Sequence, residues 1–167
     1  MYKLLVILSI FLTACQSVTT SSQIIHVFQR YQELNTQFLE SIKSNNNEKK
    51  VKREQVENYM YKEYTQALNL LEKDYCSSPN EKVLNEFIST LTSTSNSAYE
   101  KPSFTLGIIY ICQPNSIIEN VKALNVVNKK YIVNTLSFGF KNASYNKEHE
   151  IKDYAELASK LDKLRVN

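Results

Sequence analysis

The sequence predicts an all-α protein, an antiparallel bundle of five to six helices. Along most of the chain, apolar residues recur at intervals of three and four, the spacing of one helix face. The 167 residues include only two glycines and three prolines, too few for the many tight turns of sandwiches, barrels or nucleotide-cradling loops. Short polar segments separate the apolar patterns, and short connections favour antiparallel neighbours.

The first three patterns are regular. The first occupies one face with Ile24, Val27, Phe28, Tyr31, Leu34, Phe38, Leu39 and Ile42. Ser21 or Ser22 can cap this helix, and the asparagines at 45–47 are expected to end it. A second helix is predicted over 56–75, before Pro79, and a third over 83–91, before the hydroxyl-rich stretch 92–97.

The second half is less uniform. Residues 104–112 form a short continuous apolar run, which fits a buried helix or a buried strand. We expect a helix, because a lone strand has no sheet to join. The next pattern is predicted as one long helix from Pro114 to Gly139, with the glycine as its stop. A last helix is predicted from Ile151 to Leu161.

The N-terminus carries a targeting pattern. One cation, Lys3, precedes an apolar run over 4–12 that only Ser9 interrupts, and Leu12-Thr13-Ala14-Cys15 follows. This resembles the lipobox of bacterial lipoproteins, in which a small residue precedes an obligatory cysteine. The run is too short to span about 30 Å of hydrocarbon, which needs roughly 20 residues. Residues 1–14 are therefore expected to be a lipoprotein signal peptide, with a plain secretory signal or a membrane-spanning anchor as alternatives.

The lipoprotein resemblance implies that Cys15 receives a diacylglycerol on sulfur and an acyl chain such as palmitate on its amino group. Several acyl chains give stable membrane anchoring. Residues 15–22 are then a polar tether that reaches roughly 20 to 25 Å, and 23–167 form the helical domain. In Gram-negative lipoproteins an aspartate after the cysteine causes inner-membrane retention. Gln16 stands there, which implies the outer membrane, with the domain facing the periplasm.

Two further cysteines, Cys76 and Cys112, form an even pair in the oxidising compartment that a signal peptide implies. A disulfide between them would join the second predicted helix to the fourth and stabilise the fold by roughly 3 to 4 kcal/mol. Two free buried thiols and a redox or metal role are the alternatives. A thioredoxin-like role lacks support, because no Cys-x-x-Cys occurs.

No catalytic pattern is found, so the protein is expected not to be an enzyme and to carry no metal or cofactor. The two histidines, His26 and His149, lie at opposite ends of the chain, and no triad, zinc or P-loop spacing occurs. The formal charge is +3, and removal of residues 1–14 would take away Lys3 and no acid, leaving +2. This charge is too small to indicate a nucleic-acid partner.

Two surface features have alternative interpretations. The basic stretch 48–53 is expected to be a solvated connection between helices, or else a contact with anionic lipid headgroups. Tyr61 and Tyr64 are one helical turn apart, and with Tyr31 they are candidates for a groove that accepts a partner helix. The alternative for these tyrosines is a place at the edge of the core with a hydrated hydroxyl.

Anchoring without catalytic chemistry leads to the expectation that the domain binds another envelope protein, in an assembly or chaperone role. The architecture is similar to the helical class of pilotins, lipoproteins that carry secretin subunits to the outer membrane by gripping a helix. Lipoproteins of plasmid exclusion or toxin immunity are alternatives. Another is a small-molecule or lipid-binding module, with residues 104–111 lining a cavity between helices.

Overall fold

The computed structural model describes residues 2–43, 48–95, 97–145 and 147–166, with the backbone alone described at 2–20 and 166. The described residues are helical or in short connections and contain no strand, so the predicted all-α class is confirmed. The elements are α1 (Tyr2–Lys43), α2 (Lys49–Tyr59), a π-helical turn η1 (Met60–Tyr64), α3 (Thr65–Tyr75), α4 (Glu81–Ser93), α5 (Lys101–Cys112), α6 (Pro114–Lys122), α7 (Val126–Ala143) and α8 (Tyr154–Val166).

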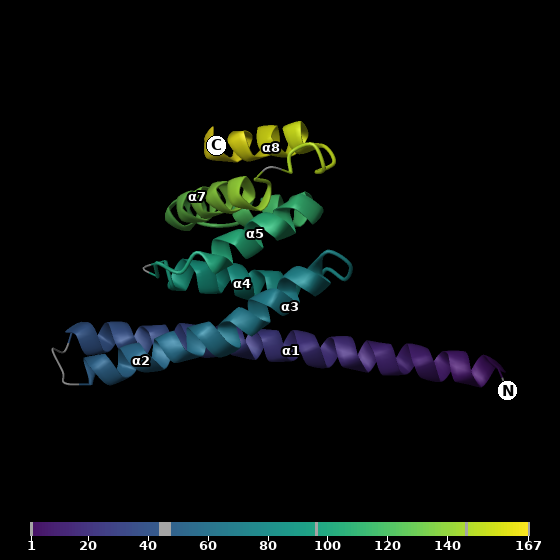
Figure 1. Cartoon of the computed structure of the whole chain (residues 1–167), viewed down its shortest axis with the longest axis horizontal. Helices are drawn as coiled ribbons and strands as arrows, with labels where there is room; N and C mark the ends of the chain where they lie inside the picture. Colours follow the sequence, from purple (N-terminus) through teal and green to yellow (C-terminus); the bar gives the residue numbers. More distant parts are fainter. Residues whose placement is uncertain (1, 44–47, 96, 146, 167) are drawn as a thin grey trace.

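The helices are stacked in tiers (Figure 1). α1 and α2 lie side by side and antiparallel at the base, and the N-terminal part of α1 extends beyond the other helices. α2, η1 and α3 follow one another without a break and lead from the base towards the middle tiers. α4 packs on α1, α5 crosses α7, and α8 covers α7 at the opposite end of the stack from α1.

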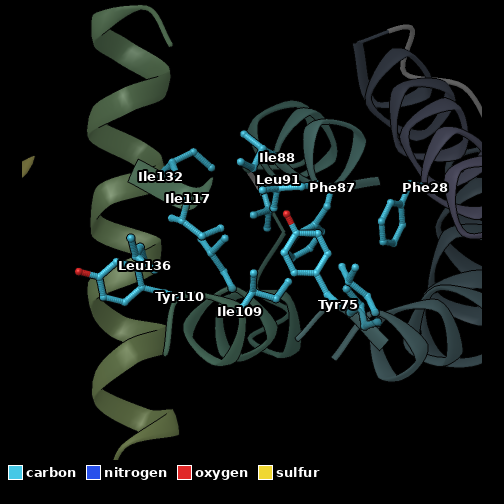
Figure 2. Close-up of a cluster of buried hydrophobic side chains, with 14 of the residues drawn as sticks. Phe28, Tyr75, Phe87, Ile88, Leu91, Ile109, Tyr110, Ile117, Ile132 and Leu136 are labelled. Atoms are coloured by element: carbon cyan, nitrogen blue, oxygen red, sulfur yellow. The ribbon is translucent and has the colours of Figure 1, made fainter. Parts of the chain in front are cut away.

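One continuous core links the tiers. Phe28 of α1 lies between the rings of Tyr64 and Phe87, with both centroids at 5.6 Å. The core continues through side chains of α3, α4, α5, α6 and α7 (Figure 2). Its labelled members in that view are Phe28, Tyr75, Phe87, Ile88, Leu91, Ile109, Tyr110, Ile117, Ile132 and Leu136. The apolar stripes of the sequence thus face one another across successive helices.

Residues 104–112 are helical, as expected, and belong to α5. The single long helix predicted from Pro114 to Gly139 is wrong in two respects. Asn125 takes an extended conformation and accepts a hydrogen bond from the Asn128 N–H at 2.9 Å, so α6 ends and α7 begins there. α7 then continues past Gly139 to Ala143, because this glycine serves a helix crossing rather than a helix end.

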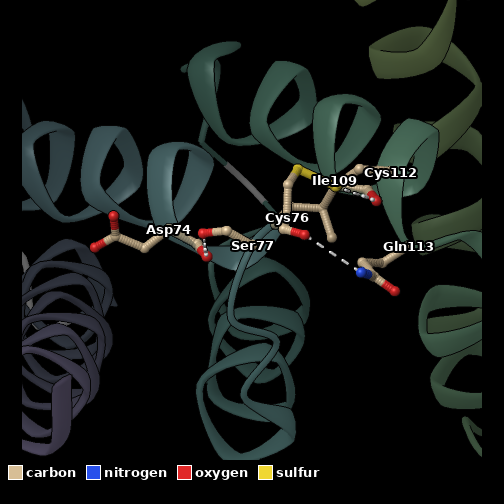
Figure 3. The surroundings of a disulfide bond; sticks show 6 residues. All are labelled: Asp74, Cys76, Ser77, Ile109, Cys112 and Gln113. Atoms are coloured by element: carbon tan, nitrogen blue, oxygen red, sulfur yellow. Dashed lines mark hydrogen bonds between the residues drawn. A yellow bond between two sulfur atoms is a disulfide. The ribbon is translucent and has the colours of Figure 1, made fainter. Parts of the chain in front are cut away.

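The predicted disulfide between Cys76 and Cys112 is present (Figure 3). It joins the residue after α3 to the last residue of α5, with 5.6 Å between the Cα atoms. The Gln113 amide donates to the Cys76 carbonyl at 3.5 Å beside it, and Ser77 Oγ donates to the Asp74 carbonyl at 3.0 Å. The cross-link therefore fixes the turn after α3 against the end of α5.

The backbone of α1 is helical from Tyr2, so the helix does not begin at Ser21 or Ser22 as the capping pattern predicted. The side chain of Cys15 and the asparagines at 45–47 lie outside the described residues. The cleavage, lipidation and tether expected at residues 1–22 remain predictions. Among the described residues, no helix combines the length and the apolar character needed to cross a membrane.

A candidate binding groove between α1 and α2

The candidate site begins at the π-helical turn η1, which joins α2 to α3 and is wider than an α-helical turn. Thr65 Oγ1 donates to the Met60 carbonyl, five residues earlier, at 2.7 Å. Tyr61 and Tyr64 both belong to this turn but differ in exposure. Tyr61 is 66% exposed, whereas Tyr64 is 1% exposed and lies in the core.

An open groove of about 670 Å³ lies beside this turn, between α1, the α2–η1 segment and residues 97–101. Its lining is formed by Tyr31, Asn35, Phe38, Lys49, Arg53, Val56, Glu57, Met60, Tyr61, Ser97, Ala98, Tyr99, Glu100 and Lys101. Two of the three tyrosines proposed from the sequence, Tyr31 and Tyr61, line it. Tyr64 does not, and supports Tyr31 from behind.

The inner wall is held rigidly. The rings of Tyr31 and Tyr64 are stacked, with centroids 4.2 Å apart and planes inclined by 15°. Tyr31 Oη donates to Ser97 Oγ at 3.5 Å, which ties α1 to the segment before α5. Burial raises the pKa of Tyr31, and the Ser97 hydrogen bond opposes that rise. Its hydroxyl is therefore neutral at ordinary pH and stays a hydrogen-bond donor.

The Tyr64 hydroxyl differs from that of Tyr31. It is fully buried and has no hydrogen-bond partner among the described residues. Burial, followed by the nearby Tyr31, Tyr99 and Tyr131 hydroxyls, raises the pKa of Tyr64 well above its usual value. The ring fills space behind the groove, and its polar atom contributes no bond there.

Tyr99 is a site residue that sequence reasoning missed. Its ring meets Tyr61 edge to face at 5.9 Å, and its hydroxyl is 2.7 Å from Thr65 Oγ1. The Tyr99 N–H also donates to Ser97 Oγ at 3.3 Å. Tyr99 follows a hydroxyl-rich loop, where helical periodicity gives no information, so no signal in the sequence points to it.

The rim of the groove is charged. Arg53 pairs with Glu57 at 2.8 Å on α2. Lys101 pairs with Glu72 of α3 at 2.6 Å, and both side chains are largely buried. Thr105 Oγ1 donates to the same Glu72 carboxylate at 2.6 Å, so this ion pair fixes the start of α5 against α3.

The basic stretch 48–53 also reaches the rim, but it is not a connection between helices. Residues 49–53 form the first turns of α2, so the prediction of a solvated connection is wrong. Lys52 donates to Gln37 Oε1 of α1 at 3.3 Å, whereas Lys49, Lys50 and Val51 are exposed. Helix α2 therefore presents cations along one side of the groove.

The other residues weighed for chemistry lie apart from the groove. His26 is exposed on α1, and His149 is exposed in the segment before α8, 3.7 Å from Glu150. Within the described part of the chain, no three His, Cys, Asp or Glu side chains form a group that could hold a metal ion. In comparisons with known proteins, no family model, no curated protein and no solved structure matches the chain.

Proposed function

We propose that this protein is a lipoprotein anchored through Cys15 whose groove binds an amphipathic helix of another envelope protein. The observation that supports this proposal most strongly is the groove, which is open, has a volume of about 670 Å³ and lies beside the antiparallel helices α1 and α2. An amphipathic helix binds such a trough with its apolar face. The role is assembly or escort of the partner, without catalysis, as in helical pilotins.

The lining includes residue types that are common in protein interfaces, namely three tyrosines, Met60 and Arg53. Tyrosine, methionine and arginine are enriched where proteins bind one another, because they combine apolar area with polar ends. Tyr31 and Tyr99 are held by hydrogen bonds and ring contacts, so little side-chain freedom is lost on binding. Tyr61, 66% exposed, is the natural first contact.

Charge complementarity specifies the partner further. Arg53 and Lys101 are paired with Glu57 and Glu72, so the cation of the groove lining that forms no ion pair with the described residues is Lys49, on the α2 side. Lys50, exposed in the same turn of α2, adds to the positive rim. The partner helix should therefore carry acidic residues beside its apolar face.

The anchor supplies the location. Lipidation of Cys15, with Gln16 after it, would hold the domain on the inner face of the outer membrane. A role in plasmid exclusion or toxin immunity would use the same anchor and groove with another partner. The small-molecule alternative would place its ligand against α5, whose Leu106, Ile109 and Tyr110 are fully buried core residues.

Photocrosslinking in living cells tests the groove. Tyr61 is replaced by a photoreactive phenylalanine analogue in the full chain, and the crosslinked peptide is sequenced by mass spectrometry. We expect one envelope protein, joined through a segment with apolar residues at helical spacing and acidic neighbours. The Ala98→Trp change, which fills the groove at an exposed position, should abolish the adduct. The same analogue at Tyr145, 68% exposed and outside the groove lining, is the control.

A crosslinked segment without helical apolar spacing, or an adduct that survives Ala98→Trp, would refute helix binding in the groove. Equal labelling of the same protein from Tyr145 would also refute it, because the contact would then not be specific to the groove.

A further inference from the structure

A second surface feature lies in the upper tiers, away from the groove. A pocket of about 510 Å³ opens between the end of α6, the first turns of α7 and the end of α8. Its lining consists of Lys122, Leu124, Val126, Lys129, Lys130, Val133, Asn134, Leu164 and Arg165. Four of these residues are cations, and none is acidic.

Most of this positive charge has no internal partner. Arg165 lies 3.5 Å from Asp162 and donates to Ser137 Oγ at 3.2 Å. Lys122, Lys129 and Lys130 take part in no ion pair with the described residues. The chain as a whole has a formal charge of only +3, so these cations are a local concentration.

The helix start adds to the positive potential. The first turn of α7 contains no acidic residue, and its side-chain cap, Asn125, accepts from the Asn128 N–H only. Lysines near a helix N-terminus are unfavourable, because the helix dipole is positive there. An anionic partner would relieve this repulsion.

Two exposed apolar residues, Val126 and Val127, lie beside the cations at the start of α7. Val126 is 83% exposed and Val127 77% exposed, the highest values among the large apolar side chains of the described residues. They are the first two residues of α7, and Val126 lines the pocket together with Leu124 and Val133. Exposed apolar side chains ringed by lysines are suited to the boundary between headgroups and acyl chains of a bilayer.

We propose that the start of α7 is a contact site for an anionic membrane surface. Val126 and Val127 enter the bilayer interface, and Lys122, Lys129, Lys130 and Arg165 bind lipid phosphates. The basic turn at 49–53 is less suited to this role, because Lys52 and Arg53 are engaged by Gln37 and Glu57. The proposal is independent of the partner helix in the groove.

Tryptophan fluorescence gives a direct test, because the chain has no native tryptophan. The full chain carrying Val127→Trp is reconstituted with phosphatidylcholine vesicles, with and without phosphatidylglycerol, and with brominated lipids as quenchers. We expect a blue shift and quenching of the emission with phosphatidylglycerol, both reversed by high salt. The matched control is Tyr145→Trp, just after the other end of α7 and 68% exposed, whose emission should not change.

A triple variant, Lys122→Gln, Lys129→Gln and Lys130→Gln, is made in the Val127→Trp protein. The ratio of molecules with the start of α7 inserted in the bilayer to molecules with it in water should fall by about a hundredfold, because each cation near an anionic surface contributes about 1 kcal/mol. Polyglutamate added without vesicles is the competing probe. A Val127→Trp emission that does not respond to phosphatidylglycerol, or that shifts equally in pure phosphatidylcholine, overturns the proposal. A shift with polyglutamate but not with anionic vesicles also overturns it and assigns the patch to an acidic protein.

Discussion

Gly107 and Gly139, the only two glycines of the chain, face each other where α5 crosses α7. A Cβ on Gly107 would overlap the Gly139 carbonyl group and lie 2.6 Å from the Phe140 nitrogen. A Cβ on Gly139 would overlap the Ser103 carbonyl oxygen. All these obstacles are backbone atoms, which cannot move aside as a flexible side chain can. The two helices therefore pack with their backbones in contact.

Substitution at this crossing should destabilise the fold. In a helix interior, alanine is normally favoured over glycine by about 1 kcal/mol. We nevertheless expect Gly107→Ala and Gly139→Ala each to lower the free energy of unfolding by about 1 to 3 kcal/mol or more, because the helices must separate. Urea unfolding measures this. The control is Asn134→Ala, at an exposed position of α7, which should be neutral or slightly stabilising. Unchanged stability of both glycine variants would contradict the close crossing.

Loss of the disulfide should lower the free energy of unfolding by an amount similar to that of the glycine substitutions, through a different mechanism. It closes a loop across a sequence separation of 36 residues. Replacing both Cys76 and Cys112 by serine should lower the free energy of unfolding by about 4 kcal/mol in the chain-entropy model. Dithiothreitol should bring the native chain to the stability of the variant and leave the variant unchanged. An equal effect of the reductant on both proteins would contradict this account.

Two buried tyrosine hydroxyls should respond oppositely to removal. Tyr110 Oη donates to the Leu157 carbonyl at 2.7 Å, so Tyr110→Phe should lower the free energy of unfolding by about 1 kcal/mol. Tyr64 Oη has no partner among the described residues, so Tyr64→Phe should leave stability unchanged or raise it by about 1 kcal/mol. Thermal or urea unfolding at neutral pH compares the two. A larger loss in Tyr64→Phe than in Tyr110→Phe would contradict the assignment.

Alkaline pH should destabilise the protein through the buried tyrosines Tyr75 and Tyr110. Burial raises the pKa of Tyr75 and of Tyr110 from 10.0 to about 12. Between these values the unfolded chain releases phenolic protons that the folded chain retains, so the free energy of unfolding falls as pH rises from 10 to 12. Below pH 10 these tyrosines are protonated in both the folded and the unfolded chain, so the free energy of unfolding is not reduced by them. Tyr110→Phe should show a shallower decline over this range, and an identical slope would contradict the shift.

The ion pair between Glu72 and Lys101 should behave as one unit. Both side chains are largely buried, and Thr105 shares the Glu72 carboxylate. Lys101→Met should lower the free energy of unfolding by about 1 to 3 kcal/mol, because the largely buried Glu72 carboxylate then loses its cationic partner. The double variant with Glu72→Gln should cost less than the sum of the single changes. Additive effects in this double-mutant cycle would show that the two residues act independently.

The helices could be predicted because their apolar stripes pack into one core, as at Phe28 and Phe87. The exact ends of the helices could not be predicted. Gly139 has the composition of a helix stop, yet its role depends on α5, which is distant in sequence. Asn125 divides one apolar pattern into two helices through a local cap that periodicity does not record.

The candidate groove was partly predictable. Tyr31 and Tyr61 belong to it, whereas Tyr64 is buried behind Tyr31. Tyr64 lies four residues after the buried Met60 and three before the buried Ala67, so helical spacing already assigns it to the core. Tyr99 reaches the groove from a connection whose path is set by tertiary contacts to Thr65 and Ser97. The basic patch at the start of α7 combines residues from three helices and is visible only in space.

Mass spectrometry of the N-terminal peptide, taken from the protein purified from its own cells, tests whether the chain is anchored through a lipidated Cys15. We predict that the mature chain begins at Cys15 and carries the mass of a thioether-linked diacylglycerol, with an acyl chain on the amino group. A chain that begins at another residue, or at an unmodified Cys15, would refute the lipid anchor.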